Sequence, residues 1–396
     1  MSLPLSGLRV LTMEQYGAGP YCSMFMADMG AEVIKVENPS SGGDFARSTG
    51  PYFLGENDSQ YFQAFNLNKR SLTLDLKTEK GQEVLHKLVK ESDAIVNNMR
   101  GNQPAKLGID YAALKSVNPK IVCGHISAYG RDNSRAAWPG YDYLMQAEAG
   151  FLSVTGEPDG PPARFGLSLV DFMTGTMLAY GVTAAIVKAK ETGEGGDVDV
   201  SLMEAALHQL TYPGVWYLNE GLVTGRAPRG AHPSVTPSQL VKSQDGWVFI
   251  MCQNPKFWGL LIDGLDRKEL GEDPRFADLA ARLENRAALT VILDEVFSKM
   301  STEAWVEKFK GIIPISPVYD MAQALDNPFL EEIDMITEVD HPDRPGLRVL
   351  NNPIKLDGKR VPIRSAPKLG ADTDELLKDI GYDDEGIAAL RDAGAI

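Results

Sequence analysis

The sequence predicts an α/β fold with a mostly parallel sheet, and two observations support this prediction. Short stretches rich in β-branched residues recur along about the first 130 residues, and helix-like stretches separate them. Strands that alternate with helices form βαβ units, whose strands lie parallel in one sheet. The strands are expected at residues 8–13, 32–37, 71–76, 93–98 and 120–127.

The helices of this part follow from the spacing of apolar residues. Residues 79–90 carry an apolar stripe at helical spacing, and Thr78 precedes them as a helix N-cap. From 141 to about 220 the chain is expected to be largely helical. Residues 171–191 would form a long apolar helix buried in the core, and "GDVDV" after it would form a short strand.

A second region begins near residue 222, where the composition changes. It contains the Gly/Pro-rich loop "GRAPRGAHPSVTP", the strand "GWVFIMC" and one amphipathic helix over 278–300. After about residue 340 come short strands and a helical C-terminal tail. We therefore expect a large α/β domain that begins with residues 1–205, a small α+β domain over 222–330, and a C-terminal part over 340–396.

Composition and charge limit the classes of function. The net charge of −15 argues against nucleic acid as a partner, because nucleic acid favours a basic surface. The three cysteines are far apart, so neither a disulfide framework nor a metal site is expected. The N-terminus lacks the features of a signal peptide, and the most apolar stretch, 13 residues long, is too short to cross a membrane. We expect a cytoplasmic protein without a membrane partner.

The stretch "GAGPYC" at 17–22 partly matches the dinucleotide-binding fingerprint GxGxxG. It follows the first expected strand, and Glu37 ends the second strand, where such sites place an acid for the ribose. Two residues weaken the match. Cys22 replaces the third glycine, and Pro20 lacks the N–H that a phosphate would bind. An NAD-binding or non-catalytic α/β protein stays open as a minor alternative.

Basic residues gather near the ends of two expected strands. Lys69, Arg70 and Lys77 surround the third strand, and two further cations follow the fourth strand at Arg100 and Lys106. Open parallel sheets bind their ligands beyond the carboxyl ends of the strands. These clusters therefore predict a ligand rich in phosphate groups.

Asp171 lies in "GLSLVDFMTG", between an apolar run and the start of the long helix. A structural role is open to it, because Asp is a preferred helix N-cap. A catalytic role is the alternative. Among the histidines, His232 is a functional candidate because it lies within the Gly/Pro-rich loop. The sequence contains no GxSxG, HExxH or P-loop motif.

A series of stretches occurs in order along nearly the whole chain: "LSGLRVL", "AGPYCSMFMADMGAEVIKVENP", "YFQAFNLNKRSLTLDLKTEKG", "DAIVNNMRGNQPAKLGIDY", "PGYDYLMQA", "LVDFMTG", "TGEGGDVDVSLMEAAL" and "LGADTDELLKDIGY". Together they resemble the class III CoA-transferase family, which includes formyl-CoA transferase and carnitine CoA-transferase. The resemblance implies a Rossmann-like large domain built from both ends of the chain, a smaller inserted domain, and an interlocked homodimer.

In that family the acid that matches Asp171 is the nucleophile. The resemblance implies that Asp171 attacks an acyl-CoA to give an aspartyl–acyl anhydride, which CoA converts to an aspartyl-CoA thioester. CoA is then a substrate, and no tightly bound cofactor is expected. The dipole of the long helix would keep Asp171 ionised. The resemblance also implies CoA-binding roles for Gly17, Ala18, Leu74, Lys77, Asn98, Met99, Arg100 and Lys106.

The resemblance does not fix which acids are exchanged. The residues expected near a small carboxylic acid are Tyr61, Tyr141, Gly230 and His232. Arg164 and Arg229 are candidates for binding the second carboxylate of a dicarboxylate. This chain has Gly17 and Asn38 where formyl-CoA transferase has glutamine and arginine, and its Gly/Pro-rich loop lacks the run of four glycines found in the family.

Racemases of α-methylacyl-CoA belong to the same superfamily and are the main alternative. They move an α-proton with a His–Asp pair, and Tyr141 occupies the position of that histidine. A tyrosine with an ordinary pKa of about 10 is a poor base at neutral pH. The sequence therefore favours a transferase over a racemase.

Overall fold

The computed structural model describes residues 2–396, which form two compact units. The first unit comprises Met1–Ala149, Gly166–Leu210 and Phe329–Ile396. The second unit comprises Gly150–Phe165 and Thr211–Pro328. This division differs from the expected one in two respects. Residues 150–165 group with the second unit rather than with the large domain, and the second unit resumes at Thr211 rather than near residue 222.

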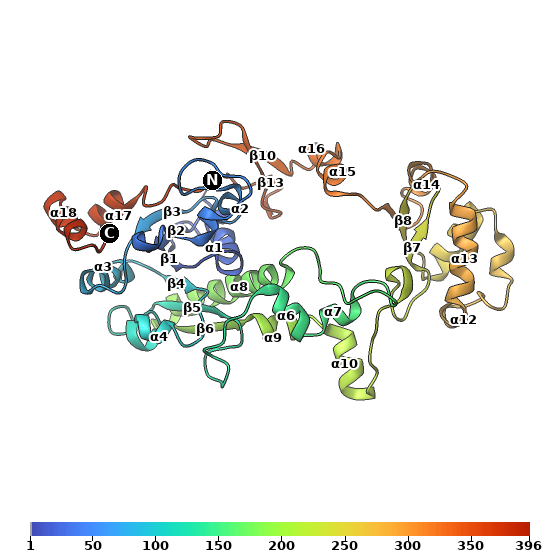
Figure 1. Ribbon diagram of the computed structural model, residues 1–396, viewed down its shortest axis with the longest axis horizontal. Helices are drawn as coiled ribbons and strands as arrows, with labels where there is room; N and C mark the ends of the chain where they lie inside the picture. Colours follow the sequence, from blue (N-terminus) through green and yellow to red (C-terminus); the bar gives the residue numbers. More distant parts are fainter. Residues whose placement is uncertain (1) are drawn as a thin grey trace. The chain divides into compact units, whose positions relative to one another are not determined.

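A six-stranded sheet forms the centre of the first unit (Figure 1), with the strand order β3-β2-β1-β4-β5-β6. All neighbouring strands in it are parallel. The strands are β1 (Arg9–Met13), β2 (Glu32–Glu37), β3 (Arg70–Thr73), β4 (Ala94–Asn97), β5 (Val122–Ser127) and β6 (Gly196–Ser201). This is the order of doubly wound α/β folds, in which the direction of winding reverses between β1 and β4. The predicted α/β fold with a parallel sheet is confirmed.

Helices connect and cover these strands. They are α1 (Ala18–Asp28), α2 (Gln60–Asn66), α3 (Glu79–Lys90), α4 (Pro104–Leu107), α5 (Tyr111–Leu114), α6 (Asp142–Glu148), α8 (Leu169–Thr192) and α9 (Leu202–His208), with short 3-10 turns at Pro39–Ser41 and Phe45–Ser48. The predicted helix over 79–90 is confirmed as α3, and the Thr78 side chain accepts the N–H of Gly81 as its N-cap.

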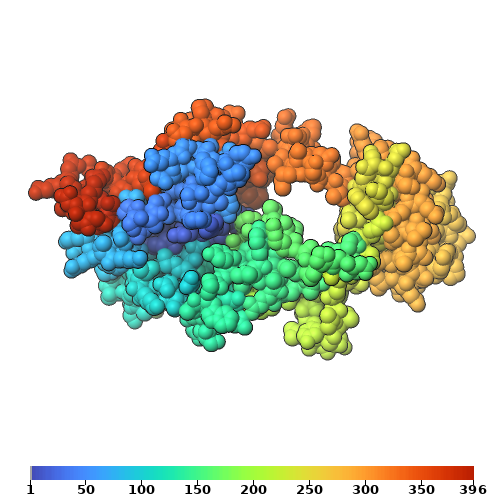
Figure 2. All heavy atoms as spheres, viewed as in Figure 1, coloured from blue at the N-terminus to red at the C-terminus, as the bar shows by residue number. Residues whose placement is uncertain are grey.

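The C-terminal part of the chain completes the first unit. It contains α16 (Phe329–Glu332), α17 (Thr373–Asp379), α18 (Asp384–Asp392) and the short hairpins β10 (Ile336–Val339) with β11 (Leu347–Leu350) and β12 (Lys355–Leu356) with β13 (Lys359–Arg360). Leu377 and Leu390 are buried in one apolar core with Leu72 and Leu85. The red C-terminal helices accordingly lie beside the blue N-terminal part in Figures 1 and 2. Both ends of the chain therefore build this unit.

The long helix α8 differs from the expectation that it is wholly buried. Leu178 and Val182 are buried, but Tyr180 is 78% exposed and Val187 is 56% exposed. With 24 residues and a mostly apolar composition, α8 is long and apolar enough to cross a membrane, by these two criteria alone. In the structure it packs against α1 and against strands β5 and β6. Gly175 permits the close approach to α1, since a Cβ there would lie 2.5 Å from the Ala18 carbonyl oxygen.

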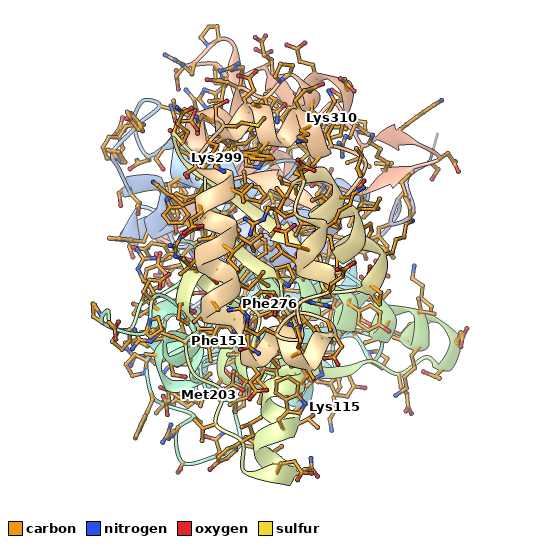
Figure 3. The ribbon with its side chains drawn as sticks, turned by 90° about the vertical axis from the view of Figure 1, so that its right-hand side faces the viewer. Lys115, Phe151, Met203, Phe276, Lys299 and Lys310 are labelled. Carbon is orange, nitrogen blue, oxygen red and sulfur yellow. The ribbon has the colours of Figure 1, made fainter. Side chains whose placement is uncertain are left out.

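The second unit contains a three-stranded antiparallel sheet. Helices of this unit face the viewer in Figure 3. Its elements are α7 (Phe151–Val154), α10 (Thr211–Glu220), β7 (Ser238–Lys242), β8 (Trp247–Met251), α11 (Pro255–Gly264), α12 (Leu279–Glu284), α13 (Arg286–Phe297), α14 (Thr302–Phe309), β9 (Ile315–Pro317) and α15 (Met321–Leu325), with 3-10 turns at Pro228–Gly230 and Lys268–Gly271. Figure 3 labels Phe276, which is buried in the core of this unit.

The single helix expected over 278–300 is wrong in detail, because Asn285 separates α12 from α13. Its backbone has φ −101° and ψ 25°, outside the helical region, and its side chain donates to the Ala281 carbonyl. Leu279, the first residue of α12, is 37% exposed and lies outside the core of this unit. An asparagine can compete for backbone hydrogen bonds in this way, and apolar periodicity does not register it.

Candidate active site

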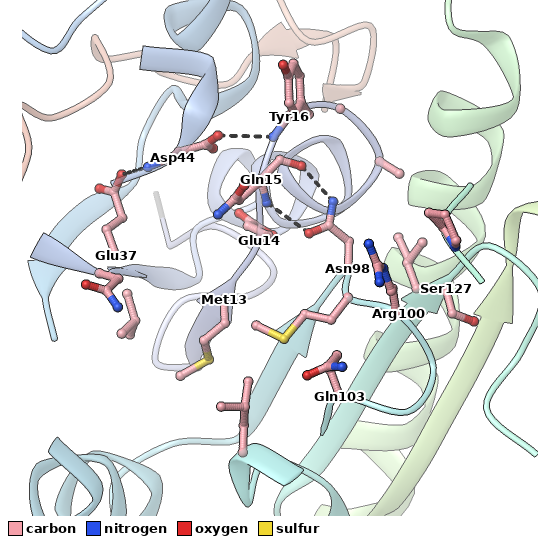
Figure 4. A pocket seen from close by; sticks show the side chains of 18 of the residues that line it. Met13, Glu14, Gln15, Tyr16, Glu37, Asp44, Asn98, Arg100, Gln103 and Ser127 are labelled. Atoms are coloured by element: carbon pink, nitrogen blue, oxygen red, sulfur yellow. Dashed lines mark hydrogen bonds between the residues drawn. The ribbon is translucent and has the colours of Figure 1, made fainter. Parts of the chain in front are cut away.

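A cavity of about 640 Å³ lies in the first unit at the carboxyl ends of the parallel strands (Figure 4). Met13 of β1, Glu37 of β2 and Ser127 of β5 line it, together with residues at the N-terminus of α1. Ligands of doubly wound sheets bind at this edge, next to the reversal of strand order. The cavity is lined by nine of the residues that the resemblance implied: Gly17, Ala18, Leu74, Lys77, Asn98, Met99, Arg100, Tyr141 and Asp171.

The structure places the other implied residues elsewhere. Lys106 is exposed on α4, next to Leu107, which lines the cavity. Tyr61 lies on α2 with its ring 6.0 Å from the ring of Tyr16, another residue of the cavity wall. Gly230 and His232 belong to the second unit.

Asp171 is the third residue of α8, and the helix N-cap is Ser168. The interpretation of Asp171 as an N-cap is therefore wrong. The Ser168 side chain makes no capping hydrogen bond either. Instead the backbone N–H of Asp171 donates to Oδ2 of Asp142, at 3.0 Å, from the first turn of α6. The Asp171 carboxylate thus does not close its own helix and is left to face the cavity.

The pKa of Asp171 is raised to about 7, first by burial and then by the negative charge of Asp142. The expectation that the helix dipole keeps this carboxylate fully ionised is therefore wrong. A helix dipole at the surface stabilises a carboxylate by only about 0.3–1 kcal/mol. Burial removes the carboxylate from water and disfavours its ionised form by more than that. Near neutral pH the group is close to half ionised, which is the range in which a carboxyl group can act as both a nucleophile and an acid.

The Asp171 carboxylate also lies against the start of α1. A Cβ built on Gly17, the N-cap of α1, would come 2.8 Å from Asp171 Oδ2. The carboxylate is therefore close to the first-turn amides of α1 as well as to those of its own helix. Such amides have no partner within their helix, and they favour negative charge.

A tight turn after β1 presents Gly17 to Asp171. Its residue Tyr16 has a positive φ of 62°, and the Tyr16 N–H donates to Asp44 at 3.2 Å. The side-chain amide of Asn98 pairs with the backbone of Gln15 through two hydrogen bonds of 2.9 and 2.7 Å, drawn as dashed lines in Figure 4. Asn98 therefore shapes the turn, a role that the sequence did not indicate.

Two of the cations that were expected to bind phosphate form ion pairs with carboxylates of the protein itself. Lys69 is 5% exposed, and its ammonium donates to Glu14 Oε1 at 2.8 Å and to the Pro20 carbonyl at 3.0 Å. Arg70 pairs with Glu32 at 2.7 Å. The prediction that these two bind phosphate is wrong, because their partners lie far away in sequence and no local pattern reveals them. Lys77 and Arg100 do line the cavity.

The acid that a dinucleotide site would use is also occupied. Arg47 donates to both carboxylate oxygens of Glu37, at 2.8 and 2.7 Å, and Ser71 donates to the same group at 2.7 Å. Burial alone would raise the pKa of Glu37, but the Arg47 guanidinium holds it below its ordinary value. Glu37 is 3% exposed. It is therefore a structural acid, and the NAD alternative loses the group that would bind a ribose.

In the second unit, side chains of the Gly/Pro-rich loop contact residues on α10, α13 and β8. The His232 ring stacks on Tyr212 at 5.6 Å, and Nε2 lies 3.0 Å from the Tyr212 hydroxyl. Arg229 pairs with Asp294 at 2.6 Å, and its guanidinium lies 4.6 Å from the centre of the Trp247 ring. The structure thus gives Arg229 a carboxylate partner within its own unit. Across residues 2–396, no cluster of His, Cys, Asp or Glu is arranged to hold a metal ion.

Comparison with known proteins gives one consistent result. The sequence model of CoA-transferase family III matches residues 5–373. A succinate–glutarate CoA-transferase from Agrobacterium fabrum is 31% identical over 389 residues, covering 95% of this chain and 96% of that protein. A succinyl-CoA:mesaconate CoA-transferase from Haloarcula marismortui is 32% identical over 396 residues, covering 96% and 97%. The crystal structure of a CaiB/BaiF family protein from Brucella suis matches with a TM-score of 0.84 at 32% identity, covering 96% and 100%.

These relatives agree with the chemistry of the cavity, which combines basic residues for an anionic ligand with a partly buried carboxylate. The predicted transferase is confirmed, and its substrates are CoA thioesters and free carboxylic acids. Tyr141, at the position where a racemase would carry histidine, lies at the rim of the cavity with 68% of its surface exposed. The chain belongs to CoA-transferase family III.

Proposed function

We propose that Asp171 is the nucleophile of the transfer. One observation carries this proposal: a partly buried carboxylate with a pKa of about 7 lies on the cavity wall, against the backbone of Gly17. Burial removes the water that would solvate the carboxylate and weaken it as a nucleophile. A covalent relay divides the exchange into smaller steps and retains the energy of the thioester.

In the proposed reaction, an oxygen of ionised Asp171 attacks the thioester carbonyl carbon. The C–S bond breaks, CoA leaves as a thiolate, and the acyl group remains as an anhydride on Asp171. The thiolate then attacks the aspartyl carbonyl carbon, which releases the first acid as a carboxylate and leaves an aspartyl-CoA thioester. The acceptor carboxylate reverses these two steps, so the cycle consumes no oxidant and no net proton.

Each attack creates a tetrahedral oxyanion, which needs hydrogen-bond donors already in place. We assign this role to the backbone amides of Gly17 and Ala18, since Gly17 contacts the Asp171 carboxylate and both residues line the cavity. The N-terminus of α1 suits this task, because its dipole favours negative charge.

The remaining implied residues would hold the CoA. Lys77 and Arg100 supply positive charge for its phosphates, and Leu74 and Met99 supply apolar surface in the same cavity. Lys106, exposed on α4, would extend this basic edge. Tyr61 would contribute to the acid-binding side, because its ring lies 6.0 Å from the ring of Tyr16 on the cavity wall and its hydroxyl senses the charge of Asp171. The role of Gly230 and His232 in binding the acid, which the resemblance implies, stays a prediction.

We propose that the exchanged acids are small dicarboxylates. The two relatives described above are named for succinate, glutarate and mesaconate, all of which carry two carboxylates. The test compares steady-state transfer from succinyl-CoA to glutarate with transfer to valerate, which has the same chain length and one carboxylate. Dicarboxylates should be faster, and equal rates would contradict the proposal.

We propose that the enzyme is a homodimer. In the first unit, Tyr21, Phe172, Met173, Thr176, Met177, Tyr180 and Gln209 line a shallow, mostly apolar hollow, and a second copy would cover it. In the second unit, α10 has no buried residue and exposes 80% of Leu218. Sedimentation should give twice the mass of 43.2 kDa, and Tyr180→Asp should lower it; a wild-type monomer at micromolar concentration contradicts the dimer.

We also propose a cytoplasmic location without a membrane or nucleic acid partner. Cys22, Cys123 and Cys252 are free and buried, as expected in a reducing compartment. The net charge of −15 disfavours both nucleic acid and anionic lipid surfaces. Fractionation of cells that express the protein would test this proposal, and recovery with membranes would contradict it.

The central experiment traps the covalent intermediate. The enzyme is mixed with succinyl-CoA and other acyl-CoAs, reduced with borohydride and mapped by peptide mass spectrometry. We expect a donor-dependent mass change on Asp171, and none in Asp171→Ala. Asp384→Asn, which alters an exposed carboxylate on α18, is the matched control and should label like the wild type. Transfer activity without any change on Asp171 would refute the nucleophile assignment.

A further inference from the structure

We infer that Asp142 is a positioning residue for Asp171, one that fixes the backbone of the nucleophile and favours its acylated form over its ionised form. The inference rests on the proposed function of Asp171. Asp142 belongs to α6, whereas Asp171 belongs to α8.

The geometry of the contact is specific. Asp142 opens α6 and is 3% exposed, and its Oδ2 accepts the Asp171 N–H at 3.0 Å. The N-cap of α8, Ser168, makes no side-chain capping bond. Asp142 therefore takes over the capping of α8 from outside the helix, and it does so at the peptide group of the nucleophile itself.

Gln146 holds Asp142 in place. It lies one turn later on α6 and is fully buried, and its Nε2 donates to Asp142 Oδ1 at 2.6 Å. The same Nε2 lies 3.2 Å from the carbonyl oxygen of Leu167, in the segment that leads into α8. Asp142 and Gln146 thus bind the backbone on both sides of the start of α8, at Asp171 and at Leu167. A carboxylate that must attack along a defined direction benefits from such a fixed backbone.

The charge of Asp142 adds a second effect. Two carboxylates close together in a partly buried site repel each other, so the charge of Asp142 disfavours the ionised form of Asp171. When Asp171 forms an anhydride or a thioester, its negative charge is lost and this repulsion ends. Among the described residues, the backbone of Gly17 on α1 and Asp142 on α6 contact Asp171, and Tyr61 on α2 is close enough for its hydroxyl to sense the charge of Asp171. The pKa of Asp171 is raised by burial first and by Asp142 second.

Three variants separate the two effects. Asp142→Asn keeps an oxygen that can accept the Asp171 N–H but removes the charge. Asp142→Ala removes both, and Asp142→Glu keeps the charge. Asp383→Asn, at the N-cap of α18, is a control for the loss of an ordinary capping carboxylate.

Two measurements are made on every variant. The first is the midpoint of the Asp171 carboxyl titration by carbon NMR, assigned with Asp171→Asn. The second is the single-turnover rate of adduct formation on Asp171 between pH 5 and 9. For Asp142→Asn we expect the titration midpoint to fall by about one pH unit and the adduct at equilibrium to fall by about tenfold. Asp142→Glu should keep the wild-type midpoint, and Asp142→Ala should also lower the rate, by about tenfold or more.

The outcomes distinguish this inference from the proposed function. An unchanged titration midpoint in Asp142→Asn would overturn the inference, whatever the enzyme does with acyl-CoA. A wild-type enzyme that transfers CoA but forms no adduct on Asp171 would overturn the proposed function, and with it the catalytic meaning of the contact. A loss of thermal stability alone, equal to that of Asp383→Asn, would mean that Asp142 is only a helix cap and would also overturn the inference.

Discussion

Gly17 lies directly against the carboxylate of Asp171, because a Cβ added to Gly17 would come within 2.8 Å of Asp171 Oδ2. A contact this short forces a shift, and the carboxylate is the partner free to move. We expect Gly17→Ala to lower kcat by about 10- to 100-fold, since a displacement of about 1 Å at a reacting group costs up to about 100-fold. The KM for acyl-CoA should change less.

Steady-state kinetics with one acyl-CoA and one acceptor checks this expectation. Gly259→Ala is the matched control, because in the described chain, apart from its chain neighbours and the nearby backbone of α11, no atom lies within 4 Å of a Cβ built there. It should keep the wild-type kcat. A Gly17→Ala enzyme with wild-type kcat would mean that the turn does not fix the carboxylate.

The pH dependence of the first half-reaction follows from Asp171. Its pKa is raised to about 7 by burial and by Asp142, and the ionised form is the nucleophile. The rate of adduct formation should therefore rise with pH through about 7 and level off above it. Below the midpoint it should fall about tenfold per pH unit. Single-turnover measurements at saturating acyl-CoA test this, and a midpoint near 4 would contradict the raised pKa.

Much of the first unit was predictable from the sequence, because local sequence patterns determine its strands and helices. The strands β1 and β2 and the helix α3 with its Thr78 cap depend on neighbouring residues. The carboxylate of Asp171 could be located only through the family resemblance. Its electrostatics could not be predicted, since Asp142 reaches it from another helix and burial is a property of the whole fold.

The same reason explains the predictions that failed. Lys69 resembled a phosphate ligand in its local context, but its partner Glu14 lies 55 residues away and both are buried. Only the parallel pairing of the strands brings these two charges together. Apolar periodicity and motif spacing cannot predict ion pairs between residues that are far apart in the sequence.

We expect the buried carboxylate of Asp171 to lower the free energy of unfolding of the enzyme at neutral pH. Its folded pKa of about 7 lies above the ordinary value of 3.8. Between pH 4 and 7 the folded protein therefore keeps a proton that the unfolded chain has lost, so stability falls as pH rises through this window. We expect Asp171→Asn to raise the free energy of unfolding by about 1–3 kcal/mol at pH 8, with little effect at pH 4. Urea unfolding at both pH values checks this, and an equal change at both would rule out titration as the cause.

Lys77 and Arg100 should serve binding rather than chemistry. Both line the cavity at the edge of the sheet, whereas Asp171 lies at the start of α8. Replacing either by alanine should raise the KM for acyl-CoA about tenfold with kcat nearly unchanged, because charge-assisted hydrogen bonds to phosphate are present before and during the reaction. Kinetics over a range of salt concentrations tests this. A fall in kcat at unchanged KM would place these residues in the chemical step.

Glu37 and Arg47 test whether the acid at the end of β2 is structural. Arg47 is 1% exposed, binds both oxygens of Glu37 and stacks on Phe62 at 3.7 Å. Arg47→Met would leave Glu37 buried without its cation, and we expect a loss of about 3–5 kcal/mol in the free energy of unfolding. Lys80→Met, which removes the exposed pair with Glu83 on α3, is the control and should change nothing measurable.

The double variant Glu37→Gln with Arg47→Met distinguishes the explanations for that loss. In the folded protein the Asp44 N–H donates to one oxygen of Glu37 and the Ser71 hydroxyl donates to the other. A glutamine there can still accept the Asp44 N–H through its oxygen, and its NH2 group can donate to the Ser71 hydroxyl. Most of the lost stability should therefore return, because removing both members of a buried ion pair costs far less than removing one. If the double variant is as unstable as Arg47→Met, the missing guanidinium matters through its packing on Phe62 rather than through charge. The wild-type protein should show no change in stability on addition of NAD, since Arg47 and Ser71 already occupy Glu37.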